Sequence, residues 1–187
     1  DDTTATPGQQ YYYWVRGTNS TSASQSDFSA SNAGYRKLPT PAGLAATDGT
    51  DLTKVTVTWT DGVGETGYTV WRNTVDASGS ATVISGVLGA GVATYDDTTA
   101  TPGQQYYYWV RGTNSTSTSQ SDFSTSNAGY RKLPTPTGVE ATDGAADTNK
   151  VTVTWTDGAG ETGYTVWRNT VDASGSATVI SGVLGAG

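Results

Sequence analysis

The feature that most constrains the fold of this chain is that nearly all of its sequence is written twice. The segment DDTTATPGQQYYYWVRGTNSTS begins at Asp1 and again at Asp96, and KVTVTWTDG begins at Lys54 and again at Lys150. A single inserted residue lengthens the offset from 95 to 96 residues. This period is too long for a solenoid repeat and fits an independent sandwich domain of about 100 residues.

Proline-rich segments predict where the domains meet. Residues 37–43 and 132–138 carry two prolines each, and Pro cannot serve a central strand. We therefore expect a whole domain at residues 38–131, the C-terminal part of a domain at residues 1–37, and the N-terminal part of a further domain at residues 132–187.

The two partial domains are complementary in sequence. The final letters VISGVLGAG continue in the first copy as VATY and then DDTT, so the chain would lead back to its own beginning if four residues were supplied. Two explanations stay open. Successive chains complete each other's split domain, as donor strands do, or the chain is part of a longer continuous polypeptide.

Period-two alternation predicts strands throughout the whole domain. In KVTVTWT, for example, Val55, Val57 and Trp59 lie on one face and the threonines on the other. The same reasoning predicts seven short strands, at residues 43–47, 54–60, 67–73, 81–85, 92–98, 105–113 and 121–130. Seven short strands separated by turn signals indicate an all-β fold, an antiparallel immunoglobulin-like sandwich in tandem repeats.

Several segments together resemble the fibronectin type III domains of large bacterial secreted and surface proteins. The resemblance covers the whole chain and is carried by PAGL at residues 41–44, Trp59, GYTVWR at residues 67–72 and TPGQQYYYWVRGTN at residues 101–114. It implies two sheets, A-B-E and C′-C-F-G, and a spacer, scaffold or adhesive role without catalytic residues. It also implies a tyrosine corner at Tyr106, with Tyr11 as its copy.

The aromatic run QQYYYWVRGTN splits between two faces if it forms a strand, because successive side chains point to opposite sides. Tyr106, Tyr108 and Val110 then face the core, and the alternate residues face outward. Strand C of the fibronectin fold neighbours strand F and directs Trp71 outward. The expected solvent-facing patch and its equivalents in the partial domains are Trp71, Tyr107, Trp109, Arg111, Tyr12, Trp14, Arg16 and Trp167.

Two interpretations of this patch stay open. In the first, each Arg guanidinium stacks on the Trp faces and covers them, in cation–π contacts of roughly 0.5–2 kcal/mol. In the second, the patch binds a neighbouring chain or a glycan, since clustered exposed aromatic residues commonly mark interaction sites.

The composition excludes several function classes. The chain has a formal net charge of −7 and contains no Cys and no His. An acidic surface argues against nucleic acid as a partner, and no apolar run is long enough to span a membrane. Without Cys and His, the common zinc sites and the Ser-His-Asp and Cys-His catalytic sets cannot form. We expect no enzyme activity, no metal and no cofactor.

Two further sets of polar residues are candidate sites. Asn19 and Asn114 each begin an Asn-Ser-Thr sequence, which fits an N-glycosylation acceptor in a secreted protein. The acidic residues near loops lack the spacing of a calcium motif, so we interpret them as solvated turn residues. They are Asp48, Asp51, Asp61, Glu65, Asp96 and Asp97.

These observations predict a structural role. The leading hypothesis is an extracellular or cell-surface fibre or stalk of near-identical fibronectin type III-like domains, whose partner is itself. The alternative is an adhesive or carbohydrate-binding accessory module of a larger secreted protein, with a glycan as the partner.

Overall fold

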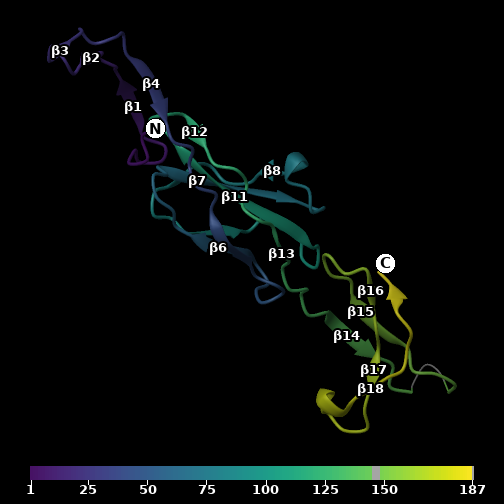
Figure 1. Cartoon of the computed structure of the whole chain (residues 1–187). Helices are drawn as coiled ribbons and strands as arrows, with labels where there is room; N and C mark the ends of the chain where they lie inside the picture. The colour runs from purple at the N-terminus through teal and green to yellow at the C-terminus, as the bar shows by residue number, and fades with distance from the viewer. Residues whose placement is uncertain (145–147, 187) are drawn as a thin grey trace. The chain divides into compact units, whose positions relative to one another are not determined.

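A computed structural model of the chain describes residues 1–144 and 148–186. Its regular elements are β-strands and two single-turn 3-10 helices, η1 (Ser78–Ser80) and η2 (Ser174–Ser176) (Figure 1). The predicted all-β fold is confirmed. None of the helices in these residues has the length and apolar character that crossing a membrane would require.

The chain forms two compact units. The first comprises residues 1–46, 56–97 and 106–128, and the second comprises residues 47–55, 98–105 and 129 onward. The predicted domain boundaries at residues 38 and 131 stay predictions.

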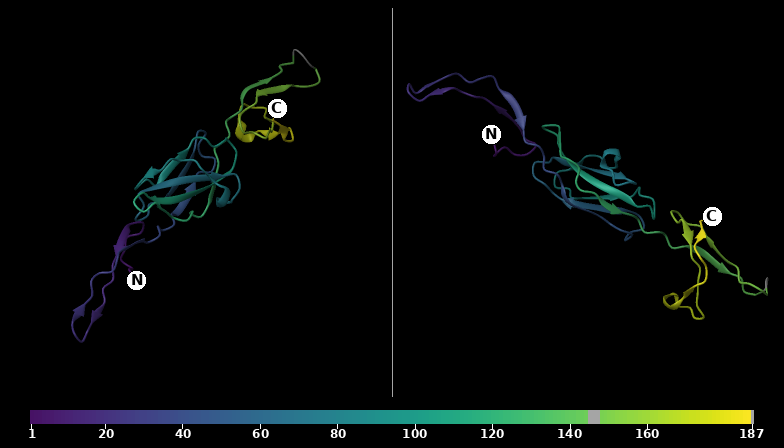
Figure 2. Two further views of the ribbon diagram at one scale, coloured as in Figure 1. Left: turned by 90° about the horizontal axis from the view of Figure 1, so that it is seen from above. Right: turned by 45° about the vertical axis from the view of Figure 1, so that its right-hand side comes forward.

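Two antiparallel sheets form the sandwich, and they lie as separate layers in Figure 2. The smaller sheet has the order β10-β6-β5, built from Thr94–Asp97, Val55–Thr60 and Ala42–Ala46. The larger sheet has the order β12-β11-β7-β8, built from Ser119–Gln120, Tyr106–Asn114, Gly67–Asn73 and Thr82–Val83. β13 (Asn127–Gly129) also pairs with β11, and β9 (Leu88–Gly89) pairs with β7. The expected sheets A-B-E and C′-C-F-G are confirmed.

The residues that strand alternation predicts to face inward form the core. Val55, Val57 and Trp59 of β6 are buried, and so are Tyr68 and Val70 of β7. The rings of Trp59 and Tyr68 pack across the two layers with their centroids 5.5 Å apart. Tyr106, Tyr108 and Val110 of β11 are buried with them, as predicted.

Shorter hairpins precede and follow the sandwich. β1 (Gln10–Tyr13) pairs with β4 (Asn32–Tyr35), and β2 (Thr18–Asn19) pairs with β3 (Ser24–Gln25). In the second compact unit, β14 (Thr137–Ala141) pairs with β15 (Val153–Thr156). There β16 (Gly163–Tyr164) also pairs with β19 (Leu184–Gly185), and β17 (Trp167–Arg168) with β18 (Thr178–Val179).

The last strand of the sandwich is shorter than expected. A strand was predicted over residues 121–130, but only Asn127–Gly129 forms one, and residues 121–126 have no regular structure. Serine hydroxyls replace the backbone acceptors of a regular ladder there, while the Ser121 and Ser124 N–H groups still donate to β11 carbonyls. The Gly112 N–H donates to the Ser121 hydroxyl at 2.9 Å, and the Val110 N–H donates to the Ser124 hydroxyl at 3.0 Å. Such side-chain bonds compete with regular strand pairing.

A tyrosine corner is present in the first copy of the repeat. The Thr6 N–H donates a hydrogen bond of 3.2 Å to the Tyr11 hydroxyl oxygen. This bond ties the strand β1 to the turn that precedes it, as the resemblance implied.

Candidate interaction face

The pairing of β7 with β11 brings the predicted outward residues together. Trp109 lies opposite Trp71 in the antiparallel register, Arg111 lies opposite Thr69, and Tyr107 lies opposite Asn73. Directly opposite and diagonal side chains on one face of a sheet are close enough to interact. Trp71, Tyr107, Trp109 and Arg111 therefore share the outer face of the larger sheet.

This face is not the open patch that alternation predicted. Trp109 is only 3% exposed, while its neighbours on the face are half-buried. Phe123, which lies in the irregular segment after β12, packs on two of these neighbours. Its ring stands edge-on to Trp71 at a centroid separation of 5.3 Å, and the Arg111 guanidinium lies 4.7 Å from its centroid.

The arginine partner also differs from the first interpretation. Arg111 stacks on Phe123 and not on a Trp face, and its Nε donates to the Ser121 carbonyl at 3.0 Å. A cation–π contact is present on this face, but its ring is Phe123 and not a Trp. The ring that it uses comes from a segment that was expected to be a plain strand.

A buried charged cluster lies on the opposite, core side of the same strands. The Arg72 Nη1 contacts the Asp97 carboxylate at 2.5 Å, and the Tyr108 hydroxyl donates to that carboxylate at 3.0 Å. The Arg72 guanidinium also lies 4.3 Å from the centroid of the Tyr106 ring. Asp97 is fully buried, so the prediction of a solvated turn residue was wrong for this position. Burial, reinforced by the Asp97 carboxylate, raises the pKa of Tyr108.

The sequence held a signal for this cluster. Arg72 lies on the same side of β7 as Tyr68 and Val70, which face the core. A guanidinium on the core side needs a carboxylate partner, because an unpaired buried charge is costly. Asp97, at the end of a strand of the facing sheet, supplies it.

The first copy of the face is open. Tyr12, Trp14 and Arg16 follow the same pattern on and after β1, and Trp14 is 54% exposed. Arg16 still lies over the Phe28 ring, 4.7 Å from its centroid. The stacking contact therefore forms within the hairpin, whereas the burial of the Trp requires more of the sandwich.

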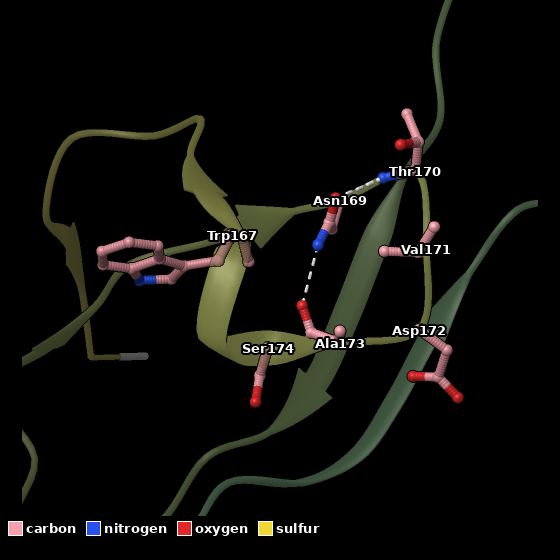
Figure 3. A pocket seen from close by; sticks show the side chains of 8 residues that line it. Trp167, Asn169, Thr170, Val171, Asp172, Ala173 and Ser174 are labelled. Atoms are coloured by element: carbon pink, nitrogen blue, oxygen red, sulfur yellow. Dashed lines mark hydrogen bonds between the residues drawn. The ribbon is translucent and has the colours of Figure 1, made fainter.

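The equivalent of Trp71 in the second compact unit is also open. Trp167 of β17 is exposed and stands at the rim of a hollow formed with the loop that follows it (Figure 3). Asn169 lines this hollow and closes the loop, since its Nδ2 donates to the Ala173 carbonyl at 2.8 Å. In the sandwich the matching residue, Asn73, is paired with Tyr107 of β11. The hollow is therefore bordered by the strand edge at which a counterpart of β11 would pair.

The two glycosylation candidates differ in accessibility. Asn19 is exposed. Asn114 is buried, and its Nδ2 donates to the Gly64 carbonyl at 2.6 Å. A glycan attached to that nitrogen is incompatible with this contact in the folded sandwich. Glycosylation stays a prediction at both positions.

Acidic side chains do not gather as a metal site in the part of the chain that the structure describes: no group of three potential ligands occurs there. The predicted absence of metal, cofactor and catalytic chemistry stays a prediction.

Comparisons with known proteins give similarity in solved structures alone. No protein-family model and no curated protein matches the chain. An Fn3-like protein from Clostridium thermocellum is 26% identical, with 52% of this chain and 98% of that chain covered and a TM-score of 0.43. The chicken CNTN1 FN1–FN3 domains are 18% identical, with 93% and 63% covered and a TM-score of 0.39.

An enzyme structure is also similar over part of this chain. Pectate lyase Pel3 from Pectobacterium carotovorum is 22% identical, with 48% of this chain covered and a TM-score of 0.42. The match spans 27% of the length of the lyase.

Proposed function

We propose that this chain is part of a structural array of near-identical fibronectin type III-like sandwiches, forming a fibre or stalk outside the cell or on its surface. The observation that carries the proposal is that equivalent residues of the two copies differ in exposure. Val15 is 73% exposed, although its counterpart Val110 is completely buried. Residues 1–37 therefore present a face that this sequence buries elsewhere.

The rest of the repeat identifies what would cover this face. In the sandwich, β11 is covered by strands whose counterparts lie in residues 132–187. The open edge beside Trp167 and Asn169 is where a strand like β1 would pair, by analogy with Asn73 and Tyr107. The cover is either the preceding repeat of a longer polypeptide or residues 132–187 of a second copy, which gives head-to-tail assembly.

The self-association of the chain is tested by introducing a charge where assembly would bury it. Val15→Asp adds a carboxylate to a side chain that is exposed in one copy and would enter a core on assembly. An unpaired charge in a core is strongly unfavourable. Val75→Asp is the matched control, because Val75 is exposed in a loop of the sandwich itself. The measurement is the mass in solution against concentration, by light scattering on the 187-residue chain.

We expect the unchanged chain and Val75→Asp to assemble and Val15→Asp to remain monomeric. If all three stay monomeric, or if Val15→Asp assembles as well as the control, head-to-tail complementation is wrong. The array is tested separately by the mass of the protein isolated from its source. A mass of many repeats supports an array, whereas a monomeric native polypeptide of 19.3 kDa overturns it.

A second candidate function is carbohydrate binding or adhesion, in an accessory module of a larger secreted protein. It is favoured by the two half-exposed rings of Trp71 and Tyr107 on the outer face of the larger sheet. Planar aromatic rings with partial exposure can stack on a sugar ring. Because Trp109 is buried, the informative variant is Trp71→Ala, with Val75→Ala as the control. Loss of glycan-array binding in Trp71→Ala alone supports this function, and no binding by the unchanged chain rules it out.

A further inference from the structure

The turn before each aromatic run is tied to the end of its own repeat. The Gly8 N–H donates to the Arg36 carbonyl at 2.8 Å, and the Arg36 Nη1 donates to the Ala5 carbonyl at 2.8 Å. The second copy repeats both bonds: the Gly103 N–H donates to the Arg131 carbonyl at 3.0 Å, and the Arg131 guanidinium reaches the Ala100 carbonyl. The Pro-Gly turn is therefore held next to the linker that leads into the following repeat.

This turn lies against the following repeat. A methyl group at Gly8 would lie 2.7 Å from the Leu38 side chain, 2.8 Å from the Asn114 Nδ2 and 2.9 Å from the Gly64 carbonyl oxygen. A methyl group at Gly64 would overlap the Pro7 carbonyl. Real side chains do not approach this closely, so two stretches of backbone meet here with no room for a Cβ on either.

The second compact unit contains the same contact in the next copy. A methyl group at Gly160 would overlap the Pro102 carbonyl, and one at Gly103 would lie 2.6 Å from the Leu133 side chain and 3.1 Å from the Gly160 carbonyl oxygen. The contact thus recurs between equivalent residues one period later.

The glycines on both sides also need their backbone conformation. The φ angles are +73° at Gly8 and +95° at Gly64, and +71° at Gly103 and +95° at Gly160. Glycine adopts these conformations without the steric cost of a Cβ. Gly64 lies in the loop GVGETG and has a second requirement, which is the close approach of the turn of the preceding repeat.

We propose that this contact is a docking interface between successive repeats. The partner is another copy of the same repeat: its Pro-Gly turn binds the surface made by Gly64, Asn114 and Leu38 of the next sandwich. Leu38 is only 2% exposed, and prolines at 39 and 41 restrict the linker that follows it. The interface limits the motion of one repeat relative to the next and makes the array stiff. This inference rests on the proposed array.

The test is a distance measurement across the contact in the full chain. The chain contains no Cys, so Ala33→Cys and Thr82→Cys give two unique positions for spin labels, both exposed. Pulsed electron spin resonance then reports the distribution of distances between β4 and β8. We expect a narrow distribution in the labelled parent chain, and a distribution at least twice as broad when Gly64→Ala is added.

The control separates docking from backbone strain. Gly91 has a φ of +75°, and no heavy atom lies within 4 Å of the place where its Cβ would be. Gly91→Ala therefore carries a comparable conformational cost without obstructing the turn, and we expect the parent's narrow distribution. Equal broadening in Gly91→Ala and Gly64→Ala overturns the proposal, as does a parent distribution that is already broad.

A second variant decides the question if Gly64→Ala does not fold. Gly8→Ala changes the other side of the contact, outside β5–β13, so the sandwich remains intact. We expect it to broaden the distribution like Gly64→Ala, and a distribution as narrow as that of the parent overturns docking. The native mass tests the array separately, so a negative distance measurement does not decide against the array. A native protein without further repeats would remove the array and still leave the contact measurable.

Discussion

The hairpin at residues 10–35 and its counterpart in residues 105–130 contain nearly the same letters, and many of their local contacts agree. Arg16 and Arg111 each lie 4.7 Å from the centroid of a Phe ring. The N–H groups of Gly17 and Gly112 each donate to a Ser hydroxyl at 2.9 Å. These contacts join residues that are near in sequence, so they form in both places.

The two regions differ in what lies against them. The second copy pairs with β7 and packs on the smaller sheet, and its core-facing side chains are buried. On its outer face Trp109 is buried, and Tyr107 and Arg111 are half-buried. The first copy pairs within itself, and Tyr12, Trp14 and Val15 are exposed. The repeat therefore encodes the hairpin and its stacking locally, whereas burial depends on strands that come from a distant part of the repeat.

The largest expected effect comes from the buried charged cluster. Asp97→Ala removes the buried carboxylate that the Arg72 guanidinium contacts on the core side. Breaking a buried ion pair costs about 3–5 kcal/mol of the free energy of unfolding. The counterpart variant Asp2→Ala removes an exposed carboxylate that accepts a bond from Tyr13 at 3.1 Å. We expect it to leave the unfolding of the sandwich nearly unchanged. Urea unfolding followed by tryptophan fluorescence measures both, and equal losses would contradict the comparison.

The next effect is a test of the cover over Trp109. Phe123→Ala removes an edge-on ring contact and a cation–π contact, which together contribute about 1–2 kcal/mol. It also uncovers the face on which Trp71 and Trp109 lie, so the emission should shift to longer wavelength. Phe28→Ala is the matched control, since Trp14 is already exposed and its emission should not move. An unchanged spectrum in Phe123→Ala would show that another group covers Trp109.

The smallest effect concerns alkaline pH. Burial raises the pKa of Tyr68 to about 12 from an ordinary value of 10.0. The folded chain therefore keeps this proton at a pH where the unfolded chain has lost it. By linkage, stability is fully present below pH 10 and falls as the pH rises toward 12. Urea midpoints measured against pH should decline in that interval, and the decline should be shallower in Tyr68→Phe. An equal slope in both would assign the decline to other tyrosines.

Several features of the fold follow from the letters of the sequence. Alternation alone placed Val55, Val57, Trp59 and Tyr108 in the core, because a strand sends successive side chains to opposite faces. It also brought Trp71 and Trp109 to one face. It could not show that Phe123 covers that face, because this ring belongs to a segment whose serine hydroxyls interrupt the strand.

Two features could not be predicted from the sequence, namely the charged cluster and the contact between repeats. The alternation of side chains along β7 puts Arg72 on the core side. Its partner Asp97 comes from the facing sheet, and no local sequence pattern connects the two residues. Likewise, the sequence around Gly64 is that of an ordinary turn, and only the structure shows the Pro7 carbonyl against it.

The letters alone predict the repeat, its period, the strands and the side of each strand on which a residue lies, because these depend on near neighbours and on strand geometry. Which of those sides is covered depends on how distant strands pack together. Burial is set by groups that are far apart along the chain, and identical letters are therefore buried in one copy of QQYYYWVRGTN and exposed in the other.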